Sequence, residues 1–134
     1  MHWLIKTEPS AYSYARLEKD QKSVWDGVTN AFAQKHIRSA RKGERAIVYH
    51  TGTERAAVGI AEIVSDPYPD PKDPALFVFD IAPAKRLQLP VSLAAIKASP
   101  LFAASPLVKM GRLSVVPLED AQWRWLLATG KTKA

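Results

Sequence analysis

The chain has 134 residues, 47% of them hydrophobic, which is enough to bury one core and too few for two ordinary domains. It carries 19 Lys and Arg against 13 Asp and Glu, and the formal charge of +6 favours polyanionic partners such as nucleic acid. Cysteine is absent, which excludes disulfides, thiolate metal sites and cysteine nucleophiles. Without a long apolar run or a signal-peptide pattern, we expect a soluble cytoplasmic protein that makes no membrane contact.

The amino-terminal segment predicts a strand followed by a short helix. Residues 2–6 read as a short strand, which ends before Pro9 because the residue preceding a proline avoids the helical region. Ser13 is placed to cap a helix over 14–19.

A second helix is predicted over 30–41. Ala33, Ile37 and Ala40 recur there at helical spacing, and basic residues occupy a different face. Gly43 closes the helix, since glycine tolerates the left-handed conformation that often follows a helix end.

The rest of the chain predicts short strands and helices around a proline-rich loop. The expected strands are 45–50, 57–64, 76–81, 85–89 and 113–116, and the expected helices are 93–98 and 119–128. The segment 66–74 holds four prolines, so we expect a surface loop that does not pair in a sheet. Strands and helices do not alternate regularly, which favours an α+β fold with a mixed, twisted, barrel-like sheet of about six strands flanked by short helices. We expect one domain over 1–130 and a flexible tail over 131–134.

The stretch Trp25-Asp26-Gly27-Val28-Thr29-Asn30 combines an aromatic plane with polar groups. Trp25 is either a core residue or the wall of a pocket, where stacking on a base contributes about 1 to 3 kcal/mol. Asp26 and Asn30 have the chemistry to read a base edge, but Asp-Gly also favours a turn and Asn30 also suits a helix cap. Gly27 either allows close backbone approach or supplies the turn.

Two further stretches place polar residues at predicted strand ends, where side chains commonly line a mouth. Lys6, Thr7 and Glu8 end the first strand, and His50 and Thr51 end a later one. Lys6 either meets a phosphate or pairs with a carboxylate, and His50 either donates to a ligand or satisfies a buried polar group.

A basic cluster extends along the second predicted helix and the turn after it. Its five members are opposed only by Glu44, so they are candidates for phosphate contact or simply form a solvated face. These residues are Lys35, Arg38, Arg41, Lys42 and Arg45.

The remaining aromatic residues are interpreted mainly as structural. Tyr68, in the proline-rich segment, is a candidate second pocket wall or a hydrophobic anchor for that segment. Trp3, Trp123 and Trp125 are assigned to the core.

Several blocks in order along nearly the whole chain carry a resemblance. They are Trp3-Leu4-Ile5-Lys6-Thr7-Glu8-Pro9-Ser10, Trp25-Asp26-Gly27-Val28 with Asn30, Tyr49-His50, Gly59-Ile60-Ala61-Glu62, Tyr68-Pro69-Asp70-Pro71, Pro90-Val91 with Leu93 and Ile96-Lys97, and Arg112-Leu113-Ser114-Val115 with Pro117-Leu118. In these blocks the chain resembles the EVE domain family of the PUA-like superfamily, whose relatives include the YTH and ASCH domains.

The resemblance implies a compact twisted β-barrel and a pocket associated in relatives with modified bases in nucleic acid. YTH domains hold a methylated adenine in an aromatic cage, and Trp25 matches one cage tryptophan, whereas its partner aromatic has no clear counterpart here. The family often has Arg, Tyr and Asn where this chain has Thr29, Ala31 and Lys35.

Three functions are weighed. The first is a non-enzymatic, cofactor-free module that binds DNA or RNA and accepts a flipped or modified base, with a monomer favoured. The second is a module for a small planar metabolite. The third is a hydrolase or nuclease using Lys6, Glu8, Asp26 and His50. The strong catalytic and metal-binding motifs are absent from the sequence, which favours the first two.

Overall fold

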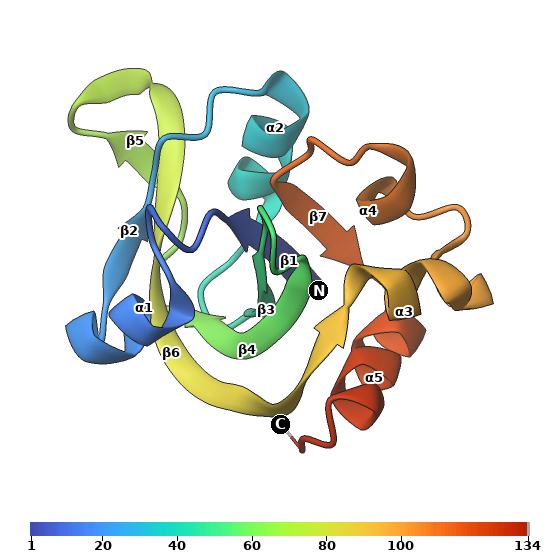
Figure 1. Cartoon of the computed structure of the whole chain (residues 1–134). Coiled ribbons are helices and arrows are strands. Elements are labelled where there is room, and N and C mark those ends of the chain that lie inside the picture. The colour runs from blue at the N-terminus through green and yellow to red at the C-terminus, as the bar shows by residue number, and fades with distance from the viewer. Residues whose placement is uncertain (134) are drawn as a thin grey trace.

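A computed structural model describes residues 1–133 and shows a curled mixed sheet (Figure 1). Its strands are β1 (His2–Thr7), β2 (Ser23–Trp25), β3 (Arg45–His50), β4 (Ala56–Ile63), β5 (Tyr68–Asp70), β6 (Asp73–Ser92) and β7 (Val115–Leu118). They pair in the order β2-β6-β4-β3-β1-β7, and β5 adds to β6. The β1–β3 pair is parallel and the other pairs are antiparallel. The mixed, partly closed barrel expected from the sequence is therefore confirmed.

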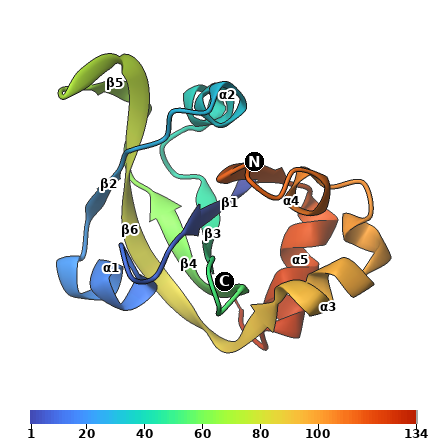
Figure 2. The same ribbon diagram turned by 45° about the horizontal axis from the view of Figure 1, so that its top comes forward.

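Short helices surround this sheet. They are α1 (Tyr14–Asp20), α2 (Ala31–Ser39), α3 (Leu93–Ala98), α4 (Pro106–Lys109) and α5 (Asp120–Thr129), with a 3-10 turn at Pro100–Phe102. Figure 2 shows α3, α4 and α5 gathered on one side and α1 and α2 elsewhere around the sheet. The predicted cap of α1 is confirmed, because the Ser13 hydroxyl accepts the Arg16 backbone N–H at 3.1 Å.

The two strands expected at 76–81 and 85–89 are one strand, β6, so the predicted break between them is wrong. β6 pairs in turn with β5, β2 and β4, and its register against β4 shifts twice. Pro83 lies within it, opposite Ala61, next to one of those shifts. Proline has no amide hydrogen to donate to the neighbouring strand. Where the pairing is irregular this missing donor is tolerated, so the proline does not end the strand.

The proline-rich segment was expected to stay out of the sheet, and this expectation is also wrong. β5 pairs with β6 through Tyr68 opposite Val78 and Pro69 opposite Phe77. The strand hydrogen-bonds only to β6, and an edge strand tolerates a proline. The Asp70 carboxylate accepts the Lys72 N–H at 2.9 Å and so closes the turn that follows.

The core is formed where β1, β3 and β4 lie side by side. Ile5, Ile47 and Ile60 are fully buried there, together with Trp3 and Phe79. Trp3 also has its polar atom satisfied, because its indole Nε1–H donates to the Glu44 carboxylate at 2.9 Å. β1 lies between β3 and β7 in the sheet, and its two ends lie in very different surroundings.

The predicted flexible tail, 131–134, lies only partly within the described residues, because 134 is outside them. Thr132 is buried, and its hydroxyl accepts the Gln88 N–H at 2.9 Å, which fastens this part of the chain to β6. Among residues 1–133, no helix is long and apolar enough to cross a membrane.

Candidate functional site

A cleft of about 670 Å³ opens beside the carboxyl end of β1. Its walls come from the end of β1 and the loop that follows, from β2 and its exit, from the residue before β7 and from the β5–β6 turn. The lining residues are Lys6, Thr7, Glu8, Ala11, Tyr12, Ser23, Val24, Trp25, Asp26, Gly27, Val28, Lys72 and Ser114. Six of the residues singled out as pocket candidates thus come together here: Lys6, Thr7, Glu8, Trp25, Asp26 and Gly27.

Hydrogen bonds to both neighbouring strands fix the end of β1. The Lys6 N–H donates to the Ser114 carbonyl at 2.9 Å, and the Thr7 carbonyl accepts the Thr51 N–H at 2.9 Å. The Thr7 hydroxyl donates to the Tyr12 carbonyl at 2.7 Å, so the loop after β1 folds back on itself. This return brings Tyr12 into the cleft wall.

Trp25 ends β2, opposite Phe79 of β6, and forms part of the cleft wall. Its side chain is 8% exposed, so most of the ring contributes to the core and a limited part faces the cleft. Its indole Nε1–H is buried and has no acceptor among residues 1–133. A buried donor without an acceptor costs about 1 to 3 kcal/mol.

Tyr12 is the second aromatic residue of the cleft, and sequence reasoning missed it. Its hydroxyl donates to the Asp20 carboxylate at 3.0 Å, and the Arg16 guanidinium lies 6.0 Å from its ring centroid. Burial raises the pKa of the Tyr12 hydroxyl, so it stays protonated at neutral pH. Nothing in the local pattern marks Tyr12, because only the fold of the loop brings it toward Trp25. The candidate second wall named from the sequence, Tyr68, does not line the cleft.

Tyr68 instead holds the β5–β6 hairpin. Its hydroxyl donates to the Asp80 carboxylate, and this hydrogen bond, followed by burial, raises the pKa of Tyr68 to about 12.

Charged side chains form the rim of the cleft. The Asp26 carboxylate is exposed and lies 4.0 Å from the Lys72 ammonium. Gly27 follows with φ +75°, a conformation that explains glycine at this exit from β2. Lys72 was not predicted as a site residue, because the hairpin that carries it was expected to be an unpaired loop.

Glu8 is held against the neighbouring strand end. Its carboxylate accepts both the N–H and the hydroxyl of Ser10, at 3.1 and 3.0 Å. A Cβ on Gly52 would meet the movable end of the Glu8 side chain, and Gly52 has φ +77°, a left-handed conformation that favours glycine.

The other three pocket candidates lie outside the cleft lining. Asn30 caps α2, with its side-chain oxygen accepting the Ala33 N–H at 3.1 Å. His50 is buried: its Nε2 accepts the Tyr14 N–H at 3.0 Å, and its Nδ1 lies 2.9 Å from the Glu54 carboxylate. Thr51 lines a second, smaller cavity on the other side of Lys6.

The predicted phosphate-binding cluster is spread over the surface. In the β1–β3 register, Arg45 is opposite His2, whereas His50 is opposite Thr7 beside the cleft. The cluster's carboxyl-terminal end therefore lies at the opposite end of β1, a separation on the order of 15 Å at 3.3 Å per residue. Arg41 donates to the carbonyls of Arg38 and Ala40 at 2.8 and 2.7 Å, a contact that terminates α2.

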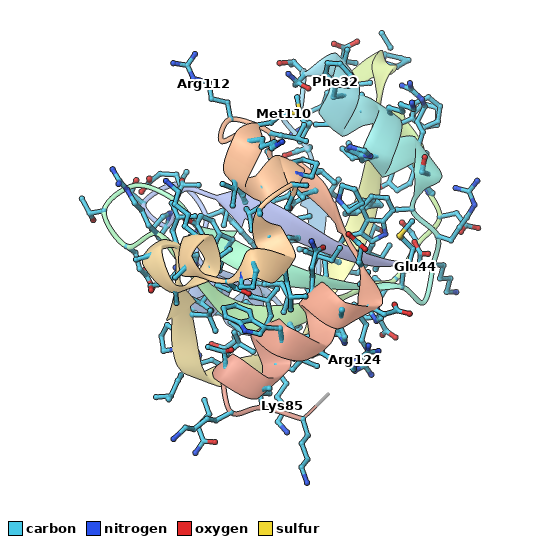
Figure 3. The ribbon with its side chains drawn as sticks, turned by 90° about the vertical axis from the view of Figure 1, so that its right-hand side faces the viewer. Phe32, Glu44, Lys85, Met110, Arg112 and Arg124 are labelled. Carbon is cyan, nitrogen blue, oxygen red and sulfur yellow. The ribbon has the colours of Figure 1, made fainter. Side chains whose placement is uncertain are left out.

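Two exposed apolar side chains accompany the basic surface. Phe32, near the start of α2, is 59% exposed and Met110, after α4, is 41% exposed. Figure 3 shows both toward the same end of the molecule as Arg112, away from Lys85 and Arg124.

The sequence profile described as "EVE domain" matches residues 1–129. The chain belongs to the EVE domain family. An NMR structure of Rpa0253 from Rhodopseudomonas palustris is similar at 39% identity with a TM-score of 0.92, covering 97% of this chain and 92% of that one.

More distant relatives extend this EVE domain comparison to animals. Thymocyte nuclear protein 1 from Gallus gallus is 35% identical over 85 residues, which are 52% of this chain and 34% of that protein. The chain thus spans only a part of the length of that curated relative. A crystal structure of human THYN1 protein in complex with 5-methylcytosine containing DNA has a TM-score of 0.83 at 24% identity, covering 99% of both chains, and shows the shared fold.

The site of this EVE domain brings together only part of the acid–base set considered from the sequence. Lys6, Glu8 and Asp26 line the cleft, but His50 does not, since its two ring nitrogens are engaged with Tyr14 and Glu54. Within the described part of the chain, no group of three or more His, Asp or Glu residues is placed to hold a metal ion.

Proposed function

We propose that this EVE domain binds nucleic acid without catalysing a reaction and that it accommodates a flipped or single-stranded base, modified in its preferred ligand, in the Trp25 cleft. The observation that carries this proposal is the cleft itself, about 670 Å³ in volume and lined by Trp25 and Tyr12 with charged groups at its rim. Unstacked bases are commonly held by aromatic planes and hydrogen bonds to their edges.

The chemistry of the cleft fits a base edge. The exposed Asp26 carboxylate can accept from an exocyclic amine, such as the 4-amino group of cytosine. The part of the Trp25 ring that lines the cleft offers a plane on which the base can stack. A planar group with an exocyclic amine would therefore gain both a stacking surface and a hydrogen-bond acceptor.

Two further observations support nucleic acid as the partner. The net charge of +6 attracts a polyanion, and the human THYN1 fold has been seen with DNA that contains 5-methylcytosine. The chain's departures from the family pattern, Thr29, Ala31 and Lys35, are exposed and lie outside the cleft lining. We expect them to change contacts around the cleft and not its floor. The cytoplasmic location expected from the sequence stays a prediction.

The test is fluorescence polarisation with labelled single- and double-stranded DNA and RNA, plain or carrying 5-methylcytosine or a methylated adenine, at two salt concentrations. We expect salt-sensitive binding that prefers a modified base. Trp25→Ala should weaken it by about 5- to 150-fold, the equivalent of 1 to 3 kcal/mol of stacking.

Trp125→Ala is the matched control, because Trp125 lies on α5, packed edge-to-face on Phe102 at 5.5 Å. The control should bind as the wild type does. Equal loss in both variants, or binding indifferent to Trp25, would overturn the proposal.

The same titrations separate the alternatives. A small planar metabolite would bind with little dependence on salt, whereas neutralisation of phosphates makes affinity fall steeply with ionic strength. Turnover of the labelled strand that disappears in Glu8→Gln would instead favour a hydrolase or nuclease.

A further inference from the structure

A second cavity of about 190 Å³ lies beside the Trp25 cleft, and Lys6 lines both. Its walls come from the ends of β1 and β3, the β3–β4 loop, α3, and α4 with the loop that follows. The lining residues are Lys6, Tyr49, Thr51, Gly52, Arg55, Leu93, Lys97, Leu107, Val108 and Gly111. Three of them are cationic and none is acidic, so the cavity favours an anion.

Lys6 is the residue that distinguishes this cavity from an ordinary basic surface. It is half-buried, its ammonium donates to the Gly111 carbonyl at 2.9 Å, and it lies 5.8 Å from the Tyr49 ring centroid. Within residues 1–133, no carboxylate lies within 4.0 Å of it. Burial without an opposing carboxylate lowers the pKa of Lys6, and a bound anion would relieve that penalty.

The other two cations also have no acidic partner within 4.0 Å in the described chain. Arg55 Nε donates to the Gly52 carbonyl at 3.1 Å, and the Arg55 carbonyl accepts the Leu93 N–H at 2.8 Å. Arg55 also has φ +48°, a left-handed conformation that is uncommon outside glycine. Lys97 follows Leu93 by one turn of α3, so both line the same cavity.

Two acidic residues lie near this cavity without lining it. Glu8 lines the Trp25 cleft, is hydrogen-bonded to Ser10 and lies against Gly52, and Glu54, in the same loop as Arg55, pairs with His50. The charged residues that line the cavity itself are all cationic.

We propose that the cavity formed by Lys6, Arg55 and Lys97 binds a backbone phosphate of the strand whose base enters the Trp25 cleft. The chemical group is a phosphodiester anion, and Arg55 supplies its fork of donors while Lys6 and Lys97 act as point charges. Lys6 lies between the cleft proposed for the base and the cavity proposed for the phosphate, so the two sites are close enough for neighbouring parts of one strand. This inference rests on the proposed function for the identity of the strand.

The test measures the affinity of a single-stranded oligonucleotide carrying the preferred base over a range of salt concentrations. The double variant Arg55→Gln, Lys97→Gln should bind at least about tenfold more weakly, because two charge-assisted contacts are lost. It should also flatten the slope of log K against log salt by about 0.7, the value for one phosphate on a single strand.

The matched control is Lys85→Gln, Arg124→Gln, which removes the same charge at two exposed residues that line neither cavity. An equal loss of affinity and slope in this control would overturn the phosphate site, since the effect would then come from net charge alone. Circular dichroism and thermal melting confirm that both double variants remain folded.

Inorganic phosphate separates the two sources of the anion. Its titration should perturb the amide NMR signals of Gly52 and Gly111 and compete with the oligonucleotide. Perturbation of these signals without competition would assign the cavity to free anions and overturn the inference.

The outcomes also separate this inference from the proposed function. In one outcome, Trp25→Ala loses the base preference while the Arg55, Lys97 double variant keeps its affinity and salt slope. This result would exclude the phosphate site and retain the proposed base-binding function. A slope that depends on Arg55 and Lys97, with no dependence on Trp25, would retain the phosphate site and remove the base pocket.

Discussion

Two tryptophans, one in β1 and one in β2, lie near opposite ends of β1 and differ in how their indole N–H groups are satisfied. At the amino-terminal end, Trp3 is 1% exposed and its indole N–H is bonded to Glu44, which also pairs with the amino terminus at 3.3 Å. Beside the carboxyl end, Trp25 of β2 is also largely buried, yet its N–H has no acceptor in the described chain. The tryptophan donor at the amino-terminal end is thus paired within the protein, whereas the other end has an unpaired tryptophan donor and the half-buried Lys6 ammonium.

This difference separates stability from function along a single strand. A buried donor without an acceptor and a half-buried cation without a carboxylate both lower the stability of the unliganded fold. Such groups are candidates for functional sites, because a ligand can offset their cost. The comparison predicts that changes at the Trp3 end act on folding, whereas changes at the Trp25 end act mainly on binding.

The largest expected effect is at the structural end. Trp3→Ala should lower the free energy of unfolding by about 3 to 5 kcal/mol, because it leaves a cavity in the core and removes the partner of Glu44. Urea denaturation followed by circular dichroism measures it. A loss below about 1 kcal/mol would mean that Trp3 contributes little to the stability of the core.

His50 sharpens the comparison, because it lies near the cleft but is predicted to act on folding. His50→Leu should lower the free energy of unfolding by about 1 to 3 kcal/mol, since the Tyr14 N–H at the start of α1 loses its acceptor. Oligonucleotide affinity, measured below the unfolding transition, should stay at the wild-type value. Weakened binding in the folded variant would show that His50 contributes to ligand binding.

Asn30 makes the same distinction with a smaller effect. Asn30→Ala should cost about 1 kcal/mol of stability through loss of the α2 cap, and Asn30→Asp should retain the cap. Thermal melting of the two variants gives the difference. If affinity falls in Asn30→Asp while the melting temperature does not, Asn30 contacts the ligand directly.

The smallest expected effect is the pH dependence contributed by Lys6. Its pKa is lowered in the folded state by burial, so the folded protein releases this proton before the unfolded chain does. The unfolded state then binds more protons, and this group makes stability rise with pH up to about 10.4, the ordinary lysine value. The difference in unfolding free energy between wild type and Lys6→Met, followed from pH 8 upward, isolates the rise. A flat difference would show that Lys6 is fully solvated.

Elements that depend on local sequence patterns could be predicted from the sequence. The α1 cap at Ser13 follows from local chemistry, and the family blocks identified the fold. β5 was missed because prolines normally disfavour strands, and only its position at a sheet edge allows the pairing.

The site was only partly predictable, for a related reason. Trp25 is followed by an Asp-Gly pair, a local signal for a turn beside a pocket. Tyr12, Lys72 and Arg55 reach their cavities through a folded-back loop, a hairpin and a left-handed backbone, none of which has a local sequence signature. The basic run 35–45 does have a local sequence signature, but it extends to the opposite end of β1.

The most direct test of the central claim uses the indole N–H signals of the four tryptophans in a ¹H–¹⁵N NMR spectrum, with Trp25 assigned through Trp25→Phe. Titration with a short single strand carrying a modified base should shift the Trp25 signal, because the base stacks on the ring, and leave the Trp3 signal unchanged. Saturable binding that leaves the Trp25 signal in place, or that moves the other tryptophans instead, would contradict the account.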